Sequence, residues 1–578
     1  MRRPVWEDVP VDENRVRAAV AALGVPPVIA RLLCQRGLDD PTAARRFLEP
    51  DLGQLHDPYL LTGMREAVAR LRAAVARRES IAIHGDYDVD GVTSTAILRR
   101  AIEVVGGDVV HFVPDRLKDG YGLQPATVER LAAAGARLIV SVDCGIRAAE
   151  AAARARDLGV DLIITDHHEP EATLPPALAV INPKRADCEY PDKHLAGVGV
   201  ALKLVQALVA DTGRAGALLP HFVKVAAIGT LADVVPLVGE NRVIARCGLQ
   251  ELSRGSHAAG LEALLEEAGL LGRTIDSFHV SFILAPRLNA AGRMSSAERA
   301  MDLLLVKGRD GDARARARDL ARSLSDENAR RQAQEADILG EARRLVDGDP
   351  AVGAHNALVV AGQGWHRGVI GIVASKLVET YNKPALVLSI EDGVAHGSGR
   401  SIAGFDLLAA LEACADLFIR FGGHRQAAGV TLEAARVGEL RRRLTAWADA
   451  RLSPDDLVPR LRIDAPLGLR EISGDVIEGL ARLGPFGAAN PKPVFRAAPI
   501  DIAQPPRRLK DRHLALLVRQ DGRSFRAIAW RAAEREEYLV ANRFGLELAY
   551  SLEQGEFLGE RTTELTVADV RVPAEARP

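Results

Sequence analysis

The sequence predicts an α/β protein in which a long helix joins a parallel-sheet domain to a smaller α/β domain, followed by a C-terminal β-barrel. Short apolar segments alternate with helical ones from about residue 62 to 183, which favours a parallel sheet. Residues 310–348 contain almost no Pro or Gly in their interior, as one long helix requires. After about residue 455, short alternating strands and turn residues indicate a barrel.

Composition describes an ordinary globular protein, with 48% hydrophobic and 26% charged residues. A formal net charge of −2 provides no overall basic field, which argues weakly against a nucleic-acid partner, although a local groove can still be basic. The cysteines lack CxxC spacing, so we expect a reducing compartment and no zinc module. They are Cys34, Cys144, Cys188, Cys247 and Cys414. Because no 18-residue apolar span is evident, we expect a cytoplasmic protein with no membrane association.

With 578 residues the chain is too long for one core, and composition shifts divide it into five segments. The predicted segments are a helical N-terminal part (1–60), a metal-binding catalytic domain (61–308), a connecting helix (309–348), a smaller α/β domain (349–452) and a barrel (453–578). Helical spacing in residues 1–60 is interrupted by Pro26, Pro27 and Pro50. We expect these short helices to pack against the domain that follows.

The catalytic segment alternates buried strands with helices of about ten residues or more. Strands are predicted at 80–85, 108–114, 137–143, 160–166 and 178–183. Helical segments of this length between short apolar strands imply right-handed crossovers and a parallel sheet. In such sheets ligands bind outside the carboxyl ends of the strands.

Polar residues gather at these predicted strand ends. The candidates are His84, Asp86, Asp88, Asp90, Asp143, Asp166, His167, His168 and Asp233. Any one of them could be a helix cap or part of an acidic turn. Three strands that deliver carboxylate or imidazole groups to one edge are harder to explain in that way. The carboxylates would repel one another unless a cation lay among them, so we predict a metal site.

The predicted ligands are hard oxygens with a few imidazoles, a set that suits Mn²⁺ or Mg²⁺. Four carboxylates and two imidazoles can hold two ions ~3.5–4 Å apart, the arrangement used for in-line displacement at phosphorus. His168 follows His167 directly and cannot easily point at the same ion. It is better placed to donate to a substrate phosphate or to protonate a leaving oxygen.

Four segments of the catalytic part resemble the motifs of the DHH phosphoesterase family. They are HGDYDVDG (84–91), SVDCG (141–145), TDHH (165–168) and GTLADVVP (229–236). The resemblance implies that the metal ligands are His84, Asp88, Asp90, Asp143, His167 and Asp233. It also implies that Asp143 bridges two ions, that Asp86 belongs to the metal set in a supporting role, and that His168 contacts the scissile phosphate.

Further segments resemble the RecJ family of single-strand-specific 5′→3′ exonucleases. They are residues 112–123, 182–204, 283–294 and 397–401. This resemblance implies that the terminal 5′ phosphate or its neighbours are held by Arg116, Arg287, Ser398 and Arg400. Arginines in Gly- and Pro-rich loops also suit bidentate binding of phosphate, although Arg116 and Arg287 could instead form structural ion pairs. Gly197 and Gly199 are expected to permit tight turns or close packing.

The second half of the chain contributes binding surfaces. Residues 310–348 are expected to form one helix or two, with a solvated Arg/Glu-rich face. The segment after 357 resembles the DHH-associated domain, with a strand at 384–390 and a helix at 405–421. Its glycine-flanked polar residues are candidates for nucleic-acid contact. They are His366, Arg367 and His424.

The barrel combines a basic cluster with aromatic residues. The cluster comprises Arg507, Arg508, Lys510 and Arg512, close to His513. Phe486, Phe495, Phe525 and Trp530 could stack on bases, although some of them must fill the barrel core. The family resemblance continues here and implies an OB-fold that guides single-stranded DNA.

The sequence therefore predicts a metal-dependent exonuclease that degrades single-stranded DNA 5′→3′ by two-metal-ion hydrolysis, in DNA repair and recombination. The resemblance further implies a single-strand-binding protein and a helicase as partners, and we expect a monomer. An alternative is a DHH phosphodiesterase for oligoribonucleotides or small phosphorylated nucleotides, against which the predicted barrel argues. A non-catalytic DHH scaffold should have lost ligands that this chain retains.

Overall fold

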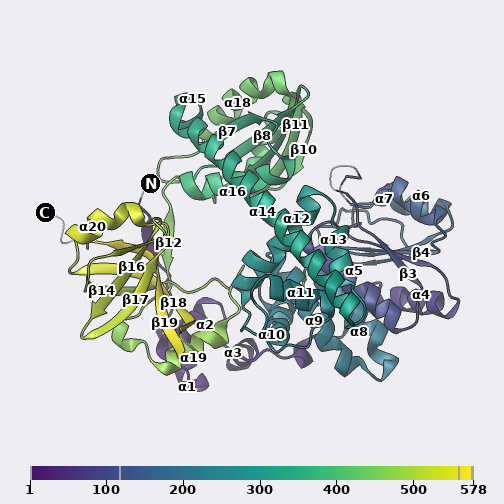
Figure 1. Cartoon of the computed structure of the whole chain (residues 1–578), viewed down its shortest axis with the longest axis horizontal. Helices are drawn as coiled ribbons and strands as arrows, with labels where there is room; N and C mark the ends of the chain where they lie inside the picture. Colours follow the sequence, from purple (N-terminus) through teal and green to yellow (C-terminus); the bar gives the residue numbers. More distant parts are fainter. Residues whose placement is uncertain (1–2, 116–118, 121, 558–559, 574–578) are drawn as a thin grey trace.

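The computed structural model describes residues 3–115, 119–120, 122–557 and 560–573. Figure 1 shows the catalytic domain on the right, the smaller α/β domain above, and the barrel on the left. The long helix α14 (Gly311–Gly348) connects the first two bodies. The predicted mixed α/β architecture is confirmed.

The catalytic sheet contains five strands that all run parallel. They are β2 (Ile81–His84), β3 (Val109–Phe112), β4 (Leu138–Val142), β5 (Asp161–Thr165) and β6 (Ala179–Ile181). Their order, β3-β2-β4-β5-β6, brings the carboxyl ends of β2, β4 and β5 side by side. Each strand lies where the apolar segments predicted it, which confirms the parallel sheet.

Helices cover both faces of this sheet. One face packs against α6 (Pro125–Ala133) and α7 (Ala149–Asp157). The other packs against α4 (Met64–Ala76), α5 (Val89–Val104) and α8 (Gly197–Val209), with α9 (Ala215–Ala232) and α10 (Gly239–Ser253) behind them. Among the described residues, α9 is long and apolar enough to cross a membrane by length and composition, so the expectation of no such span was wrong. The bent pair Glu13–Leu23 and Pro27–Gln35 passes the same test only if it is counted as one span. Half of that window is buried in the protein core.

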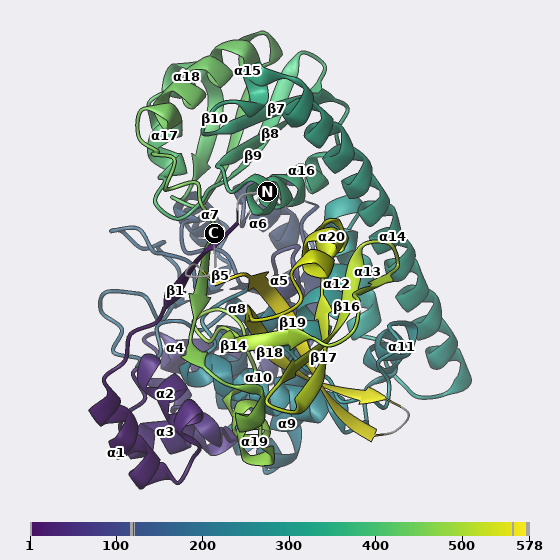
Figure 2. The same cartoon turned by 90° about the vertical axis from the view of Figure 1, so that its left-hand side faces the viewer.

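A helical layer completes the domain and meets the connector. It contains α11 (Ala259–Glu267), the π-helical turn η4 (His279–Leu284), α12 (Ala285–Met294) and α13 (Glu298–Leu304). Of these elements, α11, α12 and α13 pack against the first half of α14, where Ala317, Ala321 and Leu324 are buried, and η4 packs against α12 and α9. The second half of α14 packs against α16 of the next domain (Figure 2). Of the two expectations for 310–348, the single continuous helix of 38 residues is therefore correct.

The smaller domain has a five-stranded mixed sheet in the order β10-β11-β9-β8-β7. Its strands are β7 (Leu358–Gln363), β8 (Ala385–Glu391), β9 (Val394–Arg400), β10 (Phe418–Gly423) and β11 (Ala427–Glu433). Its helices are α15 (Pro350–Gly353), α16 (Arg367–Tyr381), α17 (Leu407–Glu412) and α18 (Val437–Asp449). The predicted helix at 405–421 was wrong beyond residue 412, because residues 418–423 pair with β11 as an antiparallel strand.

The C-terminal domain is a closed barrel of five strands, with β14 pairing with both β18 and β16. The barrel strands are β14 (Phe495–Ile502), β16 (His513–Gln520), β17 (Arg523–Ala529), β18 (Leu546–Phe557) and β19 (Glu560–Arg571). Flanking elements are β13 (Ala465–Pro466), α19 (Gly474–Leu483), β15 (Arg507–Leu509) and α20 (Glu536–Ala541). This confirms the predicted barrel.

The expectation that residues 1–60 pack against the next domain in the chain is correct only in part. Leu52, Leu55 and Tyr59 pack against the catalytic core, whereas the N-terminal helices pack mainly against the barrel domain. These helices are α1 (Glu13–Leu23), α2 (Pro27–Gln35) and α3 (Pro41–Leu48). Ile29 and Leu33 of α2 share one core with Leu480 of α19 and Phe495 of β14. In addition, β1 (Val5–Asp8) pairs in parallel with β12 (Arg460–Ile463). The two ends of the chain thus form one unit, seen as purple helices beside the yellow barrel in Figure 1.

Arg242 of α10 in the catalytic domain contacts the unit formed by the N-terminal helices and the barrel domain. Its side chain is only 2% exposed and lies over the Phe47 ring, with the guanidinium carbon 3.6 Å from the ring centroid. The guanidinium donates to the backbone carbonyls of Phe47, Arg482, Leu483 and Gly484 at 2.8–3.0 Å. A buried arginine is stable only with such partners, and here they hold three segments together.

Candidate metal centre

The acidic loop after β2 is shaped by the start of α5. Asp88 caps this helix by accepting from the Gly91 amide at 3.1 Å. Asp90, which is 2% exposed, accepts from the backbone amides of Gly197 and Val198 at the start of α8, both at 2.7 Å. The positive end of the α8 dipole therefore faces this carboxylate and stabilises its charged form.

The ends of β4 and β5 supply the next groups. Asp143 adopts a φ of 60° immediately after β4, and its amide donates to the Thr165 carbonyl at 3.0 Å. From the end of β5, the Nε2 atom of His167 lies 3.2 Å from Asp143 Oδ1. The same nitrogen lies 3.6 Å from an oxygen of Asp233, the residue that ends α9, and 3.9 Å from one of Asp90. Residues distant in the sequence thus meet at one point.

Three groups of side chains could each hold a metal ion. They are Asp90, His167 and Asp233; Asp143, His167 and His168; and Asp86, Asp88 and Asp143. Within each group, one ligand atom from every residue lies within 4.8 Å of the others. Asp143 and His167 belong to two groups each, so the three groups share members. The side chains are therefore arranged as one extended cluster at the sheet edge.

Asp166, the first residue of the triplet, orients the other two residues. Its Oδ1 accepts from the backbone amides of His167 and His168 and lies 2.7 Å from His168 Nδ1. Burial would raise the pKa of Asp166, but the hydrogen bonds from His168 lower it overall. In return, this carboxylate raises the pKa of His168 against the opposing effect of burial. His168 therefore holds a proton more readily than an isolated histidine.

His84 is placed differently from the other predicted ligands. It is fully buried at the end of β2, and its Nδ1 lies 3.1 Å from the Gly85 carbonyl oxygen. Its Nε2 has no hydrogen-bond partner in the part of the chain that the structure describes. It belongs to none of the three candidate groups found among the described residues. Its role as a ligand stays a prediction, supported by the unpartnered nitrogen.

The electrostatics of the cluster favour a bound cation. Burial and neighbouring carboxylates raise the pKa values of Asp90 and Asp143, and burial together with Asp88 raises that of Asp233 to about 7. Burial lowers the pKa values of His84 and His167 to about 4, which keeps both imidazoles in the neutral form that binds metals. Asp143 Oδ1 and His167 Nε2 are buried and lie 3.2 Å apart, but they form no hydrogen bond with each other or with any other described residue. Mutual repulsion and unpartnered ligand atoms fit Mn²⁺ or Mg²⁺ at this site.

Three family models match the chain. They describe the DHH family N-terminal domain (residues 80–230), the DHHA1 domain (354–450) and the RecJ OB domain (463–569). A Bacillus subtilis protein, described as single-stranded-DNA-specific exonuclease RecJ, is 39% identical over 542 residues, which cover 93% of this chain and 67% of the relative. An Escherichia coli protein of the same description is 35% identical over 94% of this chain and 96% of its own. The chain belongs to the RecJ family.

The fold agrees with this assignment. The crystal structure of Thermus thermophilus RecJ in complex with Mn²⁺ superposes with a TM-score of 0.81 at 34% identity, covering 99% of this chain and 80% of that one. The structure of the same protein with Mg²⁺ gives a TM-score of 0.77 at 32% identity. Both ions were predicted from the ligand chemistry of this sequence.

The predicted phosphate-binding residues of this RecJ-family chain lie on two domains. Arg287 of α12 donates to Ser325 Oγ of α14 at 3.1 Å and to the Ile283 carbonyl at 2.7 Å, and burial lowers its pKa. Arg400 of β9 donates to Ser398 Oγ at 3.2 Å. The predicted residue Arg116 lies outside the described residues.

Helix α16 connects these two sets of residues. A Cβ added at Gly371 would lie 3.0 Å from Ser398 Oγ and 3.4 Å from an Arg400 nitrogen, so α16 packs directly against that pair. One added at Gly368 would lie 2.4 Å from the Arg293 carbonyl oxygen at the end of α12. Glycine therefore allows α16 to touch both the α12 side and the β9 side of this region.

The other candidates in the smaller domain have local roles in the structure. His366 caps α16 by accepting from the Gly368 amide, and Arg367 pairs with Glu391 at 3.1 Å. His424 is exposed in the tight turn between β10 and β11. Nucleic-acid contact by these residues stays a prediction.

Two residues support the metal cluster in ways that the sequence alone did not predict, and one of them, Asn289, was not singled out at all. A Cβ at Gly197 would lie 2.3 Å from Asp143 Oδ1, so only glycine fits beside this carboxylate. The expectation of close packing at Gly197 was right, but its neighbour could not be identified. Asn289 of α12 accepts from the Val89 amide at 3.1 Å and supports the acidic loop from outside. Both residues lie in segments that resemble the RecJ family, 182–204 and 283–294, and this resemblance was the signal that could have indicated their importance.

The barrel carries its own polar surface. Arg508 is paired with Glu536, whereas Arg507, Lys510 and Arg512 form no ion pair among the described residues. Trp530 is 58% exposed and meets His513 edge-on, with ring centroids 4.8 Å apart. Phe495, in contrast, is fully buried in the barrel core. Of the four predicted stacking residues, Trp530 is therefore the most available.

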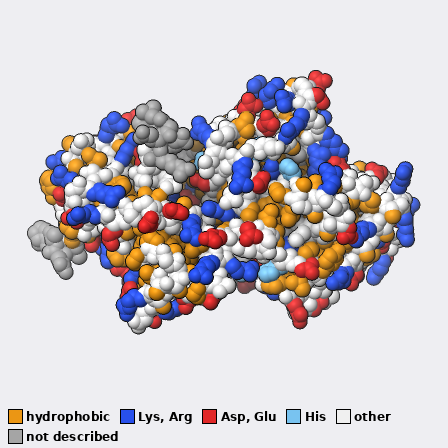
Figure 3. Space-filling model, turned by 90° about the horizontal axis from the view of Figure 1, so that it is seen from below, with side chains coloured by type: hydrophobic (Ala, Val, Ile, Leu, Met, Phe, Trp, Pro, Cys, Tyr) orange, Lys and Arg blue, Asp and Glu red, His pale blue; other side chains and the backbone are white. Residues whose placement is uncertain are grey.

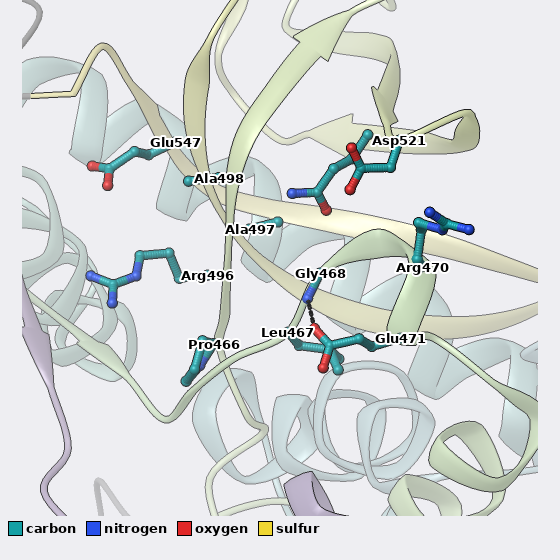
Figure 4. Close-up of a pocket in the computed structure, with 11 residues that line it drawn as sticks. Pro466, Leu467, Gly468, Arg470, Glu471, Arg496, Ala497, Ala498, Asp521 and Glu547 are labelled. Atoms are coloured by element: carbon teal, nitrogen blue, oxygen red, sulfur yellow. Dashed lines mark hydrogen bonds between the residues drawn. The ribbon is translucent and has the colours of Figure 1, made fainter.

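A cavity of about 590 Å³ lies on the barrel domain, away from the metal cluster (Figure 4). Arg470, Arg496, Glu471 and Glu547 line it, so its charges are mixed. Glu471 is engaged with the Gly468 amide and Arg496 with Asp8. The face of the molecule shown in Figure 3 likewise intersperses basic and acidic side chains. Among the described residues, no member of the three candidate metal groups lines this cavity.

Proposed function

We propose that this protein is a metal-dependent, single-stranded-DNA-specific exonuclease that degrades DNA from the 5′ end. The observation that carries this proposal is the cluster of carboxylates and imidazoles at one sheet edge, with unpartnered ligand atoms on Asp143 and His167. The presence of an OB barrel in the same chain supports a nucleic-acid substrate over a small nucleotide. RecJ relatives described as single-stranded-DNA-specific exonucleases support the substrate class.

The ligands proposed for two Mn²⁺ or Mg²⁺ ions are His84, Asp86, Asp88, Asp90, Asp143, His167 and Asp233. When bound, two such ions supply Lewis-acid activation of water and neutralise charge on a phosphoryl group. Asp143 is proposed to bridge them, because it takes part in two of the candidate groups. Gly197 and the start of α8 hold the carboxylates of Asp143 and Asp90 in place.

His168 is proposed to act on the phosphate. Its Nδ1 is engaged by Asp166 at 2.7 Å, which fixes the ring and leaves Nε2 for the substrate. Since its pKa is raised, the imidazole can donate a hydrogen bond to a phosphate oxygen or a proton to the leaving oxygen. This division between ligand (His167) and donor (His168) follows from their different partners.

Direction is proposed to come from arginines and a serine hydroxyl that hold the terminal 5′ phosphate. The candidates are Arg116, Arg287, Ser398 and Arg400, with His424 contacting the strand nearby. Arg287 and Arg400 lie on α12 and β9, and both of these elements contact the first turns of α16. A phosphate held there would place the 5′ terminal nucleotide between the catalytic and smaller domains.

The biological setting follows from the family and is proposed in the same way. We propose a cytoplasmic monomer that acts in DNA repair and recombination, with a single-strand-binding protein and a helicase as partners. The basic cluster of the barrel and Trp530 would guide the incoming strand.

Single strands labelled at either the 5′ or the 3′ end test this proposal. With Mn²⁺ or Mg²⁺, the 5′ label should appear first in mononucleotides, and blocking the 5′ end should stop degradation. Shortening from the 3′ end, or equal degradation of duplex, would contradict the direction or the strand specificity. Faster hydrolysis of short oligoribonucleotides than of DNA would favour the alternative phosphodiesterase.

The role of Arg287 has its own experiment. We expect Arg287→Ala to reduce turnover of 5′-phosphorylated strands about tenfold or more relative to strands with a 5′ hydroxyl, since a charge-assisted contact is lost. Manganese affinity, measured by calorimetry, should be unchanged. An equal loss on both kinds of end would show that Arg287 has a structural role through Ser325 and Ile283.

A further inference from the structure

Phe278 and Phe282 form an exposed aromatic pair on the catalytic domain. They are 58% and 68% exposed, and their rings stack with centroids 5.0 Å apart and planes inclined by 29°. Full burial of a phenylalanine side chain contributes about 1.5–3 kcal/mol, and neither residue gains this in the folded chain. Two adjacent exposed phenylalanines are the kind of apolar surface that marks a binding site.

The position of the pair relates it to the metal cluster. The π-helical turn η4 contains Phe282 and packs against α9, whose last residue is followed by Asp233. Ser281, next to Phe282, donates to the carbonyl of Leu231 at 3.2 Å, two residues before Asp233. Val234, on the other side of Asp233, is 70% exposed and adopts a φ of 60°. The pair therefore lies on an element that contacts the end of α9, next to the candidate metal centre.

The pair also lies beside the segment that leads into the barrel. Ser277, next to Phe278, donates to the Phe486 carbonyl at 2.9 Å. The Leu237 amide donates to the Ala488 carbonyl at 2.8 Å, so residues 485–490 lie against the stretch that follows Asp233. A strand that passed from the barrel to the metal centre along this seam would meet Phe278 and Phe282.

We infer that Phe278 and Phe282 are positioning residues that stack on unpaired bases of the substrate between the barrel and the metal centre. This inference rests on the proposed function. A phenyl face suits a nucleobase because stacking needs no hydrogen-bond complementarity and therefore accepts any sequence. A base paired in a duplex exposes no face to the pair, so the same contact would favour single strands.

The experiment compares a normal oligodeoxynucleotide with one of equal length that carries a block of abasic residues behind its 5′ end. For the full-length protein with Mn²⁺, we expect KM to rise about tenfold on the abasic strand, because stacking on aromatic side chains is lost. The double variant Phe278→Ala/Phe282→Ala should show this raised KM on the normal strand and no further rise on the abasic one. Its kcat should stay close to that of the parent protein.

Two controls separate stacking from loss of structure. Phe278→Tyr/Phe282→Tyr retains the ring faces and should restore the normal KM. Val104→Ala, at the far end of α5 from the acidic loop, removes an exposed apolar group (40% exposed) and should leave KM unchanged. An unchanged KM for the alanine double variant, or equal increases on both strands, would overturn the inference. Failure of the parent protein to cleave single strands would instead overturn the proposed function.

Discussion

Asp143 combines a left-handed backbone conformation with a buried carboxylate. Its φ is 60° and its side chain is 2% exposed. Burial, and then the charges of Asp90, Asp88, Asp86 and Asp233, raise the pKa of this carboxylate. Asparagine tolerates the left-handed region better than most residues, so this position can be made neutral without backbone strain. A substitution at this position can therefore test whether repulsion between the carboxylates destabilises the metal-free protein.

We predict that Asp143→Asn abolishes metal-dependent nuclease activity and leaves the metal-free protein at least as stable as the parent. Relief of about 1 kcal/mol of repulsion corresponds to an increase in Tm of about 2–4 °C in a domain of this size. Mn²⁺ should raise the Tm of the parent protein and have a much smaller effect on the variant. Thermal denaturation with and without Mn²⁺ measures both effects.

The exposed Asp337 of α14 provides the matched control, and Asp337→Asn should change neither the activity nor the response to Mn²⁺. A variant at Asp143 that responds to Mn²⁺ like the parent would contradict its assignment as a ligand.

Gly197 is predicted to be irreplaceable for catalysis. In Gly197→Ala, the new Cβ would lie 2.3 Å from Asp143 Oδ1, so the carboxylate must move. A displacement of about 1 Å at a catalytic group can reduce the rate about 100-fold. Nuclease assays and manganese calorimetry measure the loss. Gly216→Ala, which meets open space at the start of α9, should behave like the parent protein; equal behaviour of the two variants would refute the steric argument.

At the scale of single elements, Arg242 shows how α10 is tied to the rest of the molecule. We predict that Arg242→Ala destabilises the protein by about 3 kcal/mol, since the carbonyls of two segments, Phe47 and residues 482–484, lose a charged donor. The neighbouring Arg246 makes a single 3.2 Å contact to the Ala481 carbonyl, so Arg246→Ala should cost much less. Urea denaturation compares the two variants. Equal destabilisation would mean that Arg242 contributes no more than an ordinary helix residue.

Some of these elements could be predicted from the sequence, and others could not. The strands and their acidic ends were predictable because apolar periodicity and strand length are local properties, and parallel connectivity then brings the ends together. The strand at 418–423 was missed because its apolar residues directly follow a helical pattern, and pairing with β11 decides its conformation. Contacts such as Arg242 with Leu483, or Gly197 with Asp143, join distant positions and leave no local pattern.

At the scale of the whole molecule, the chain's two ends form one unit that faces the catalytic and smaller domains. Removal of the barrel would uncover Ile29, Leu32 and Leu33 of the N-terminal helices. Surface substitutions in the full-length chain therefore test the barrel more cleanly than truncation does.

We predict that replacing Arg507, Lys510 and Arg512 by serine weakens binding of single-stranded DNA and flattens its salt dependence. Each phosphate contact contributes a slope of about −0.7 in a plot of log K against log salt for single strands. The triple variant should therefore lose up to about 2 units of slope, measured by fluorescence anisotropy in the Asp143→Asn background to prevent cleavage.

Arg508→Ser is the control for this experiment, because Arg508 is already neutralised by Glu536. It should leave the slope nearly unchanged. If the triple variant keeps the parent's slope of log K against log salt, single-stranded DNA does not contact this loop of the barrel.

The shared core of the N-terminal helices and the barrel has a consequence for synthesis in the cell. Helix α2 leaves the ribosome early, but Phe495 and the barrel strands that cover it are made last. At about 5–20 residues per second, an apolar face of α2 would wait on the order of half a minute or more for its partner. The catalytic and smaller domains can fold during this interval. The newly made chain must therefore protect its first helices from aggregation until its final segment emerges.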